Sequence, residues 1–124
     1  MKPKTLLVED NPENRYLAIY LLEKGGFDVL VSANGTDALE KAKTEKPESI
    51  LLDIQLPDIE GYEVARQLKS SPETASIPII AVTSFAMAGE KIRAAQAGCI
   101  GYIEKPIDPM KFVQQIKTFL NKKS

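Results

Sequence analysis

The stretch Ser49-Ile50-Leu51-Leu52-Asp53-Ile54-Gln55-Leu56-Pro57 decides the fold of this chain. Its apolar run has no polar alternation and leads straight into a carboxylate, which is typical of a strand covered by helices on both faces. Pro57 lacks a backbone N–H, so the strand ends soon after Asp53. In open α/β sheets, ligands bind just outside the carboxyl ends of the strands. We therefore predict that Asp53 is the reactive residue, although taken alone it could simply cap the following turn.

The rest of the chain alternates strand-like and helix-like segments. Apolar runs predict four further strands, at residues 5–8, 27–31, 77–83 and 100–103. Cap residues and helical spacing predict helices after Asn11-Pro12, after a turn at Asn34-Gly35, from Gly61, over 87–97, and after Asp108-Pro109. This alternation predicts a parallel sheet with helices on both faces, joined by right-handed crossovers. We expect a single α/β domain over residues 1–124.

Composition excludes several classes of function. The chain has sixteen basic and seventeen acidic residues, so its net charge is close to zero. Neither nucleic acid nor an anionic membrane is therefore expected as a partner. No apolar run approaches the ~20 residues of a membrane span. The lone Cys99 cannot form an internal disulfide, which favours a reducing cytoplasm. The absence of histidine excludes His-containing zinc sites and a His general base.

Polar side chains follow four of the five predicted strands: Glu9-Asp10, Asp53, Thr83 and Lys105. Each has an ordinary reading, as a helix cap, a backbone hydrogen bond or a solvated charge. In a parallel sheet, however, all of them meet at one rim. Clustered carboxylates repel one another and favour a divalent cation, and oxygen ligands favour Mg²⁺.

A carboxylate can also attack phosphorus and form an aspartyl phosphate. Lys105 and Thr83 are the kinds of donor that stabilise the moving phosphoryl oxygens. The sequence has no nucleotide-binding motif, neither G-x-x-x-x-G-K-[ST] nor G-x-G-x-x-G after a strand. The phosphoryl group must therefore come from another molecule.

With Glu9-Asp10, Asp53, Thr83 and Lys105-Pro106 in this order on strand ends, the whole chain resembles the receiver domain of two-component response regulators, in the CheY-like superfamily. Segments 53–57 and 98–103 strengthen the resemblance. Segment 85–90 is most similar to stand-alone receivers of the DivK cell-division type and to receivers of hybrid histidine kinases. The resemblance implies a flavodoxin-like (βα)5 three-layer sandwich, whose five-stranded parallel sheet has the order 2-1-3-4-5.

The resemblance also implies roles for the rim residues. Asp53 would take a phosphoryl group from a histidine kinase or a histidine phosphotransfer protein, with Thr83 and Lys105 holding its oxygens. Mg²⁺ would be bound by Asp10, Asp53 and the Gln55 carbonyl, with Glu9, a permitted variant of the usual Asp, acting through water. Thr83 and Tyr102 would form the conformational switch, and Lys105-Pro106 would be cis. Gln55 and Phe85 stand at variable positions that tune dephosphorylation, which leaves the phosphoryl lifetime open.

The first helix offers a surface for the phosphoryl donor. Leu17, Ala18, Leu21 and Leu22 are expected on its core face, which places Tyr16, Ile19 and Tyr20 together on the outside. Adjacent exposed apolar and aromatic residues are typical of interfaces. Similar receivers dock a histidine-bearing helical bundle around this helix, and the Pro106-Ile107 loop should flank the same surface. The alternative is that these side chains pack on a neighbouring loop.

Two other functions remain open at this point. The first is a Mg²⁺-dependent phosphohydrolase, but such enzymes commonly carry D-x-D at the first strand and a cap domain, whereas this chain has Asp10-Asn11-Pro12. The second is a receiver that acts as a scaffold without phosphorylation. A phosphorylation-driven receiver, not an enzyme in its own right, would signal to a downstream effector protein as a monomer or weak dimer. The sequence does not decide between a stand-alone protein and a piece of a hybrid kinase.

Overall fold

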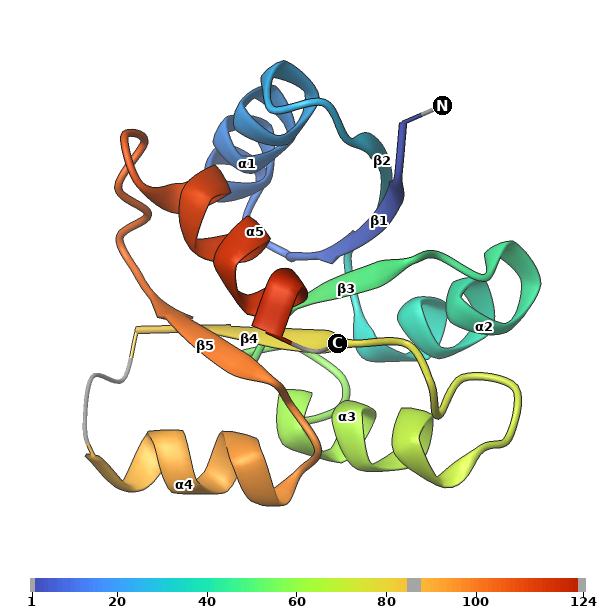
Figure 1. Ribbon diagram of the computed structural model, residues 1–124. Helices are drawn as coiled ribbons and strands as arrows, with labels where there is room; N and C mark the ends of the chain where they lie inside the picture. The colour runs from blue at the N-terminus through green and yellow to red at the C-terminus, as the bar shows by residue number, and fades with distance from the viewer. Residues whose placement is uncertain (1, 85–87, 123–124) are drawn as a thin grey trace.

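The computed structural model describes residues 2–84 and 88–122, and Figure 1 shows strands and helices alternating along them. The strands are β1 (Lys4–Val8), β2 (Asp28–Ser32), β3 (Ser49–Asp53), β4 (Ile79–Thr83) and β5 (Gly101–Glu104). The helices are α1 (Pro12–Lys24), α2 (Gly35–Glu45), α3 (Gly61–Ser70), α4 (Ala88–Gln96) and α5 (Phe112–Lys122). All strand pairs are parallel and their order is β2-β1-β3-β4-β5, which confirms the flavodoxin-like fold.

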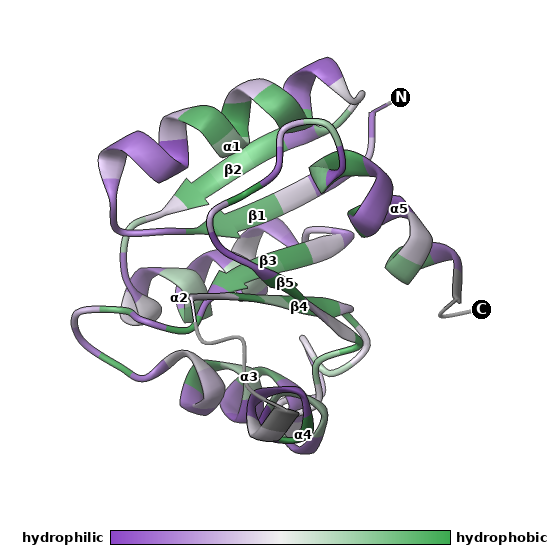
Figure 2. Ribbon diagram, turned by 90° about the vertical axis from the view of Figure 1, so that its left-hand side faces the viewer, coloured by the Kyte–Doolittle hydropathy of each residue, from purple (hydrophilic) through white to green (hydrophobic). Residues whose placement is uncertain are grey.

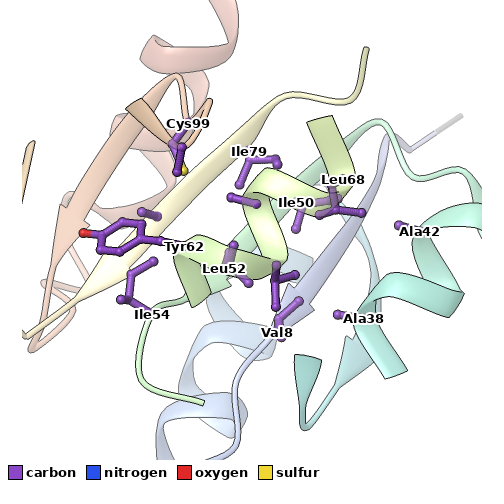
Figure 3. Packing of buried hydrophobic residues seen from close by; sticks show 14 of the residues in the cluster. Val8, Ala38, Ala42, Ile50, Leu52, Ile54, Tyr62, Leu68, Ile79 and Cys99 are labelled. Atoms are coloured by element: carbon purple, nitrogen blue, oxygen red, sulfur yellow. The ribbon is translucent and has the colours of Figure 1, made fainter. Parts of the chain in front are cut away.

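Two apolar layers hold the helices to the sheet. Ile50 and Leu52 of β3 face the layer shared with α2, α3 and α4, whereas Leu51 faces the layer shared with α1 and α5. Strand side chains alternate between the faces of a sheet, so one apolar run supplies both layers. Figure 3 shows the first layer, where Val8, Leu52 and Tyr62 come from different elements. All five residues of β3 are buried, as predicted for the central strand.

The hydropathy pattern explains why this arrangement is stable. Hydrophobic stretches lie along the strands, and the helices mix hydrophobic with hydrophilic residues (Figure 2). Such amphipathic helices bury one stripe against the sheet and leave the other in water. None of the helices formed by the described residues has the length and apolar character needed to cross a membrane.

Several predicted boundaries are confirmed and a few move. Asn11 caps α1 with Pro12 as the first helical residue, as expected. Asn34-Gly35 is not a separate turn, because the Asn34 side chain accepts the Asp37 N–H and Gly35 begins α2. β4 begins at Ile79 and not at Ile77, since Pro78 cannot donate to the sheet.

The remaining shifts are near helix starts. The last helix begins at Phe112, after a turn in which the Asp108 carbonyl accepts the N–H groups of Lys111 and Phe112. α4 spans Ala88–Gln96 within the predicted range, whose first residue, Met87, lies outside the described residues, as does Phe85.

Candidate functional site

The carboxyl ends of four strands bring the predicted polar residues to one rim. Glu9 and Asp10 follow β1, Asp53 and Thr83 are the last residues of β3 and β4, and Lys105 follows β5. Because the sheet is parallel, these ends all lie on the same side. The grouping expected from the sequence is therefore present.

Lys105 links two buried carboxylates at the centre of the rim. Its Nζ lies 3.0 Å from Oε1 of Glu9 and 3.1 Å from Oδ2 of Asp53. The Asp53 side chain is 2% exposed and that of Glu9 is 4% exposed, so both pairs are shielded from water. A buried charge needs such a partner, because desolvation otherwise disfavours its ionised form.

The surroundings of Asp53 disfavour its ionised form relative to water. The pKa of Asp53 is raised to about 6, chiefly by burial and also by the neighbouring Glu9 carboxylate. The Gln55 N–H that donates to Oδ1 of Asp53 and the Lys105 ammonium act in the opposite direction. Burial works against protonation of Lys105, but contacts with Glu9 and Asp53 outweigh it and raise the pKa of Lys105. Lys105 thus stays cationic beside the candidate acceptor.

The rim also has the charge and donor set of a divalent cation site. Carboxylate oxygens of Glu9, Asp10 and Asp53 all lie within 4.8 Å of one another. Three carboxylates with one ammonium, that of Lys105, leave two negative charges. Hard oxygen ligands and this residual charge fit Mg²⁺.

Arg15 is a contributor that the sequence argument missed. Its Nη1 donates to the Glu9 backbone carbonyl at 3.1 Å, and the Asn11 N–H donates to Oε2 of Glu9 at 3.2 Å. Both bonds fix the short loop that carries Glu9 and Asp10. The available signal was a cation one turn into the helix that follows these acids.

Thr83 and Tyr102 lie on neighbouring strands. Thr83 is fully buried at the end of β4, and its carbonyl accepts the Lys105 N–H at 2.8 Å. Tyr102 is half-buried in β5, and Nζ of Lys91 lies 5.6 Å from its ring centroid. Tyr102 also lines a cavity of about 300 Å³ between α4 and α5. The Lys105-Pro106 peptide bond is cis, as expected.

The predicted donor surface needs one correction. Tyr16 and Tyr20 are 80% and 58% exposed, as expected. Ile19, however, is half-buried and packs against the α1–α5 layer, so its placement on the outer face was wrong. Ile107 packs against the same layer, whereas Pro106 is exposed. The helical period alone does not set the width of the buried stripe, which depends on what packs beside it.

Comparison with known proteins agrees with this geometry. The sequence model of the protein family described as the response regulator receiver domain matches residues 5–117 of this chain. The polar-differentiation response regulator DivK of Brucella anthropi is 43% identical over 120 residues, covering 97% of this chain and 98% of that protein.

Solved structures of response regulators and receiver domains are also similar to this chain. A putative response regulator from Chloroflexus aurantiacus superposes with a TM-score of 0.92 at 27% identity, covering 98% of this chain and 99% of the other. The receiver domain of the sensor histidine kinase PA1611 from Pseudomonas aeruginosa has a TM-score of 0.88 at 30% identity, with 98% and 99% covered. That structure holds a magnesium ion in its active-site cleft. Receiver domains of this kind are signalling proteins and not classical enzymes. This chain belongs to the response regulator receiver domain family.

Proposed function

We propose that Asp53 accepts a phosphoryl group from a phosphohistidine, and that the phosphorylated chain signals through altered contacts with a downstream effector protein. The observation that carries this proposal is the pairing of buried Asp53 with Lys105, 3.1 Å away, at the end of the central strand. The donor is a histidine kinase or a histidine phosphotransfer protein in the cytoplasm.

The transfer follows from the residues at the rim. A carboxylate oxygen of Asp53 attacks phosphorus while the bond between phosphorus and the histidine nitrogen breaks. That nitrogen keeps the bonding electron pair and takes up a proton. Lys105, a donor already in place, meets the developing charge, and the Thr83 hydroxyl then joins it in holding the phosphoryl oxygens.

Mg²⁺ is the cofactor that fits the acidic cluster. Asp10, Asp53 and the Gln55 carbonyl would hold it, with Glu9 acting through water. When bound, the ion supplies positive charge opposite the transferring phosphoryl oxygens. Lys105 alone leaves the three carboxylates under-neutralised, which supports this assignment.

The conformational response involves Thr83 and Tyr102. The Thr83 hydroxyl moves toward the phosphoryl oxygen, and the half-buried Tyr102 ring turns inward behind it. A phosphoryl group shifts this equilibrium only by interacting differently with the two states. Thr83 is the residue that makes this difference.

Tyr16, Tyr20 and Pro106 form the exposed part of the surface on which the donor protein docks, supported from beneath by Ile19 and Ile107. Tyrosines that offer an apolar ring and a polar tip are favoured at interfaces. The surface begins one turn after Asp10, so a bound donor places its histidine beside Asp53.

The proposal is tested by incubating the wild type and Asp53→Asn with acetyl phosphate and Mg²⁺ and measuring intact mass. We expect one alkali-labile phosphoryl group per wild-type chain and none on the variant. Full incorporation into Asp53→Asn would place the acceptor elsewhere. Repeated turnover of a generic phosphate ester would favour the phosphohydrolase, and no incorporation into the wild type would favour the scaffold.

A further inference from the structure

Asp58 ties the loop after the acceptor strand to a different helix. The loop runs from Ile54 to Glu60 and joins β3 to α3. Oδ1 of Asp58 accepts the N–H groups of Gly35 and of its own neighbour Ile59, each at 2.8 Å. Its Oδ2 accepts the N–H and the hydroxyl of Thr36 at 2.9 and 2.7 Å. Both carboxylate oxygens are therefore engaged, with three of the bonds reaching across to α2.

The first turn of α2 suits a carboxylate. The first N–H groups of a helix have no partner within it, and the helix dipole favours negative charge there. Asn34 caps only the N–H of Asp37, which leaves those of Gly35 and Thr36 for Asp58. These backbone and hydroxyl donors hold the pKa of Asp58 well below its usual range, so its charge is retained at neutral pH.

Close packing reinforces the connection. A Cβ atom at Gly35 would lie 2.8 Å from Cγ2 of Val64 and 3.1 Å from Cβ of Ile59. The start of α2 is thus in van der Waals contact with both the loop and α3. Movement of the loop away from α2 would break the Asp58 hydrogen bonds and this packing together.

The same loop is anchored to the rim at its beginning. The Ile54 N–H donates to the Val82 carbonyl at 3.1 Å, and the Gln55 N–H donates to Oδ1 of Asp53 at 3.0 Å. The Gly61 N–H closes the loop by donating to the Ile54 carbonyl at 3.0 Å. Gln55 therefore sits on a segment held by the sheet on one side and by Asp58 on the other.

We propose that Asp58 is a positioning residue for the Mg²⁺ site, which fixes the loop bearing the Gln55 carbonyl and couples metal binding to the first turn of α2. This inference rests on the proposed function, because it takes Gln55 as a metal ligand. Coupling between two sites is reciprocal. Metal binding must then strengthen the hydrogen bonds between Asp58 and α2 by the same factor by which those bonds strengthen metal binding.

A purely structural role for Asp58, as a helix cap, makes a different prediction. Asn34→Ala provides the matched control, because it removes another cap from the same end of α2 without altering the loop. A cap loss of this kind costs about 0.5–2 kcal/mol of stability. If Asp58 matters to Mg²⁺ only through the stability of α2, both variants weaken Mg²⁺ binding equally.

The experiment titrates the wild type, Asp58→Asn and Asn34→Ala with Mg²⁺. The affinity of each protein for Mg²⁺ is obtained from the changes in its amide chemical shifts. We expect Asp58→Asn to weaken Mg²⁺ binding at least fivefold and Asn34→Ala to change it less than twofold. Thr36→Val, which deletes one hydroxyl bond from the α2 side, should weaken binding by a smaller factor. The double variant Thr36→Val/Asp58→Asn should lose less Mg²⁺ affinity than the product of the two single losses, since Thr36 and Asp58 are hydrogen-bonded to each other.

Hydrogen exchange provides a second readout, which like the titration needs no phosphorylation. Mg²⁺ should slow hydrogen exchange of the Gly35 and Thr36 amides in the wild type and leave it unchanged in Asp58→Asn. Wild-type affinity in Asp58→Asn, or equal weakening in Asn34→Ala, would overturn the positioning role. Failure of the wild type to bind Mg²⁺ would instead contradict the proposed function, so the two failures are distinguishable.

Discussion

The Tyr62 hydroxyl donates a hydrogen bond of 2.6 Å to Oε2 of Glu90, joining the first turn of α3 to the first turn of α4. The Tyr62 side chain is buried, and the Glu90 side chain is only 13% exposed. Cζ of Arg93 lies 4.6 Å from the Tyr62 ring centroid, and its guanidinium also pairs with Glu60 at 2.7 Å. Burial and the adjacent Glu90 carboxylate raise the pKa of Tyr62, which keeps the hydroxyl a donor.

This bond should measurably stabilise the attachment of α4. Tyr62→Phe keeps the ring but removes the donor to Oε2 of the mostly buried Glu90 carboxylate, while Arg93 still pairs with Oε1 at 3.4 Å. Hydrogen bonds to charged groups contribute about 1.5–3 kcal/mol, so we expect the free energy of unfolding in urea to fall by about 2 kcal/mol. Amide exchange in α4 should accelerate more than in α1. Tyr20→Phe, at a mostly exposed site, is the control and should change stability by less than about 0.5 kcal/mol; equal effects of the two variants would contradict this assignment.

Metal-free protein should lose stability as Asp53 ionises. Its pKa of about 6 when folded lies above the ordinary value near 3.9, so the folded state holds the proton more tightly. For a raised carboxyl pKa, the free energy of unfolding falls as pH rises through the window between about 4 and 6 and then levels off.

Asp53→Asn removes this cost. In EDTA at pH 7.5 we expect the variant to be more stable than the wild type, by on the order of 3 kcal/mol, and the two to converge near pH 4. Mg²⁺ should raise the melting temperature of the wild type alone. A wild type more stable than the variant at pH 7.5 without metal would refute this electrostatic account.

Replacement by alanine should change the stability of the protein in opposite directions at two glycines. Among the described residues, nothing lies within 4 Å of a Cβ placed on Gly89 in α4, so Gly89→Ala should stabilise the protein by about 0.5–1 kcal/mol. A Cβ on Gly61 would lie 2.5 Å from Cα of Ile54 and 2.7 Å from the Asp53 carbonyl oxygen. Gly61→Ala must displace the backbone at Asp53 and Ile54 and should destabilise the fold. Calorimetric melting of both variants measures this, and a loss of stability in Gly89→Ala would be inconsistent with open space there.

The donor surface should be separable from the rim chemistry. Tyr16→Ala should slow phosphoryl transfer from a histidine-bearing donor protein at least tenfold, about 1.4 kcal/mol, because it removes an exposed aromatic contact. Phosphorylation by acetyl phosphate should be unchanged, since that small donor needs only the rim. Ile92→Ala, at a 58% exposed position on α4, is the matched control and should leave transfer from the donor protein unchanged. If Tyr16→Ala slows both donors equally, Tyr16 acts on the rim and not on docking.

The grouping of the strand-end residues was predictable because its signals are local. Asp53 and Thr83 end apolar runs, and Glu9-Asp10 and Lys105 stand at similar boundaries. A parallel sheet then necessarily brings these boundaries to one side. The strand order itself came from the family resemblance and not from periodicity.

Other features depend on which elements pack together. Ile19 was assigned to the wrong face of α1 because periodicity gives the direction of a buried stripe but not its width, and α5 widens the layer that covers it. Asp58 carried a signal for a turn after Pro57, but nothing in its neighbourhood pointed to Gly35 and Thr36.

The sequence by itself thus determined the alternation of strands and helices, the burial of β3 on both faces and the grouping of Asp53 with the other strand-end residues, because each follows from the apolar runs and the residues that end them. Only the tertiary structure decided the α2 partners of Asp58, which lie 22 and 23 residues away, and the Glu90 partner of Tyr62, which lies 28 residues away. Such contacts depend on how each helix is rotated and how closely it approaches its neighbours. Side-chain packing across the whole core sets both quantities.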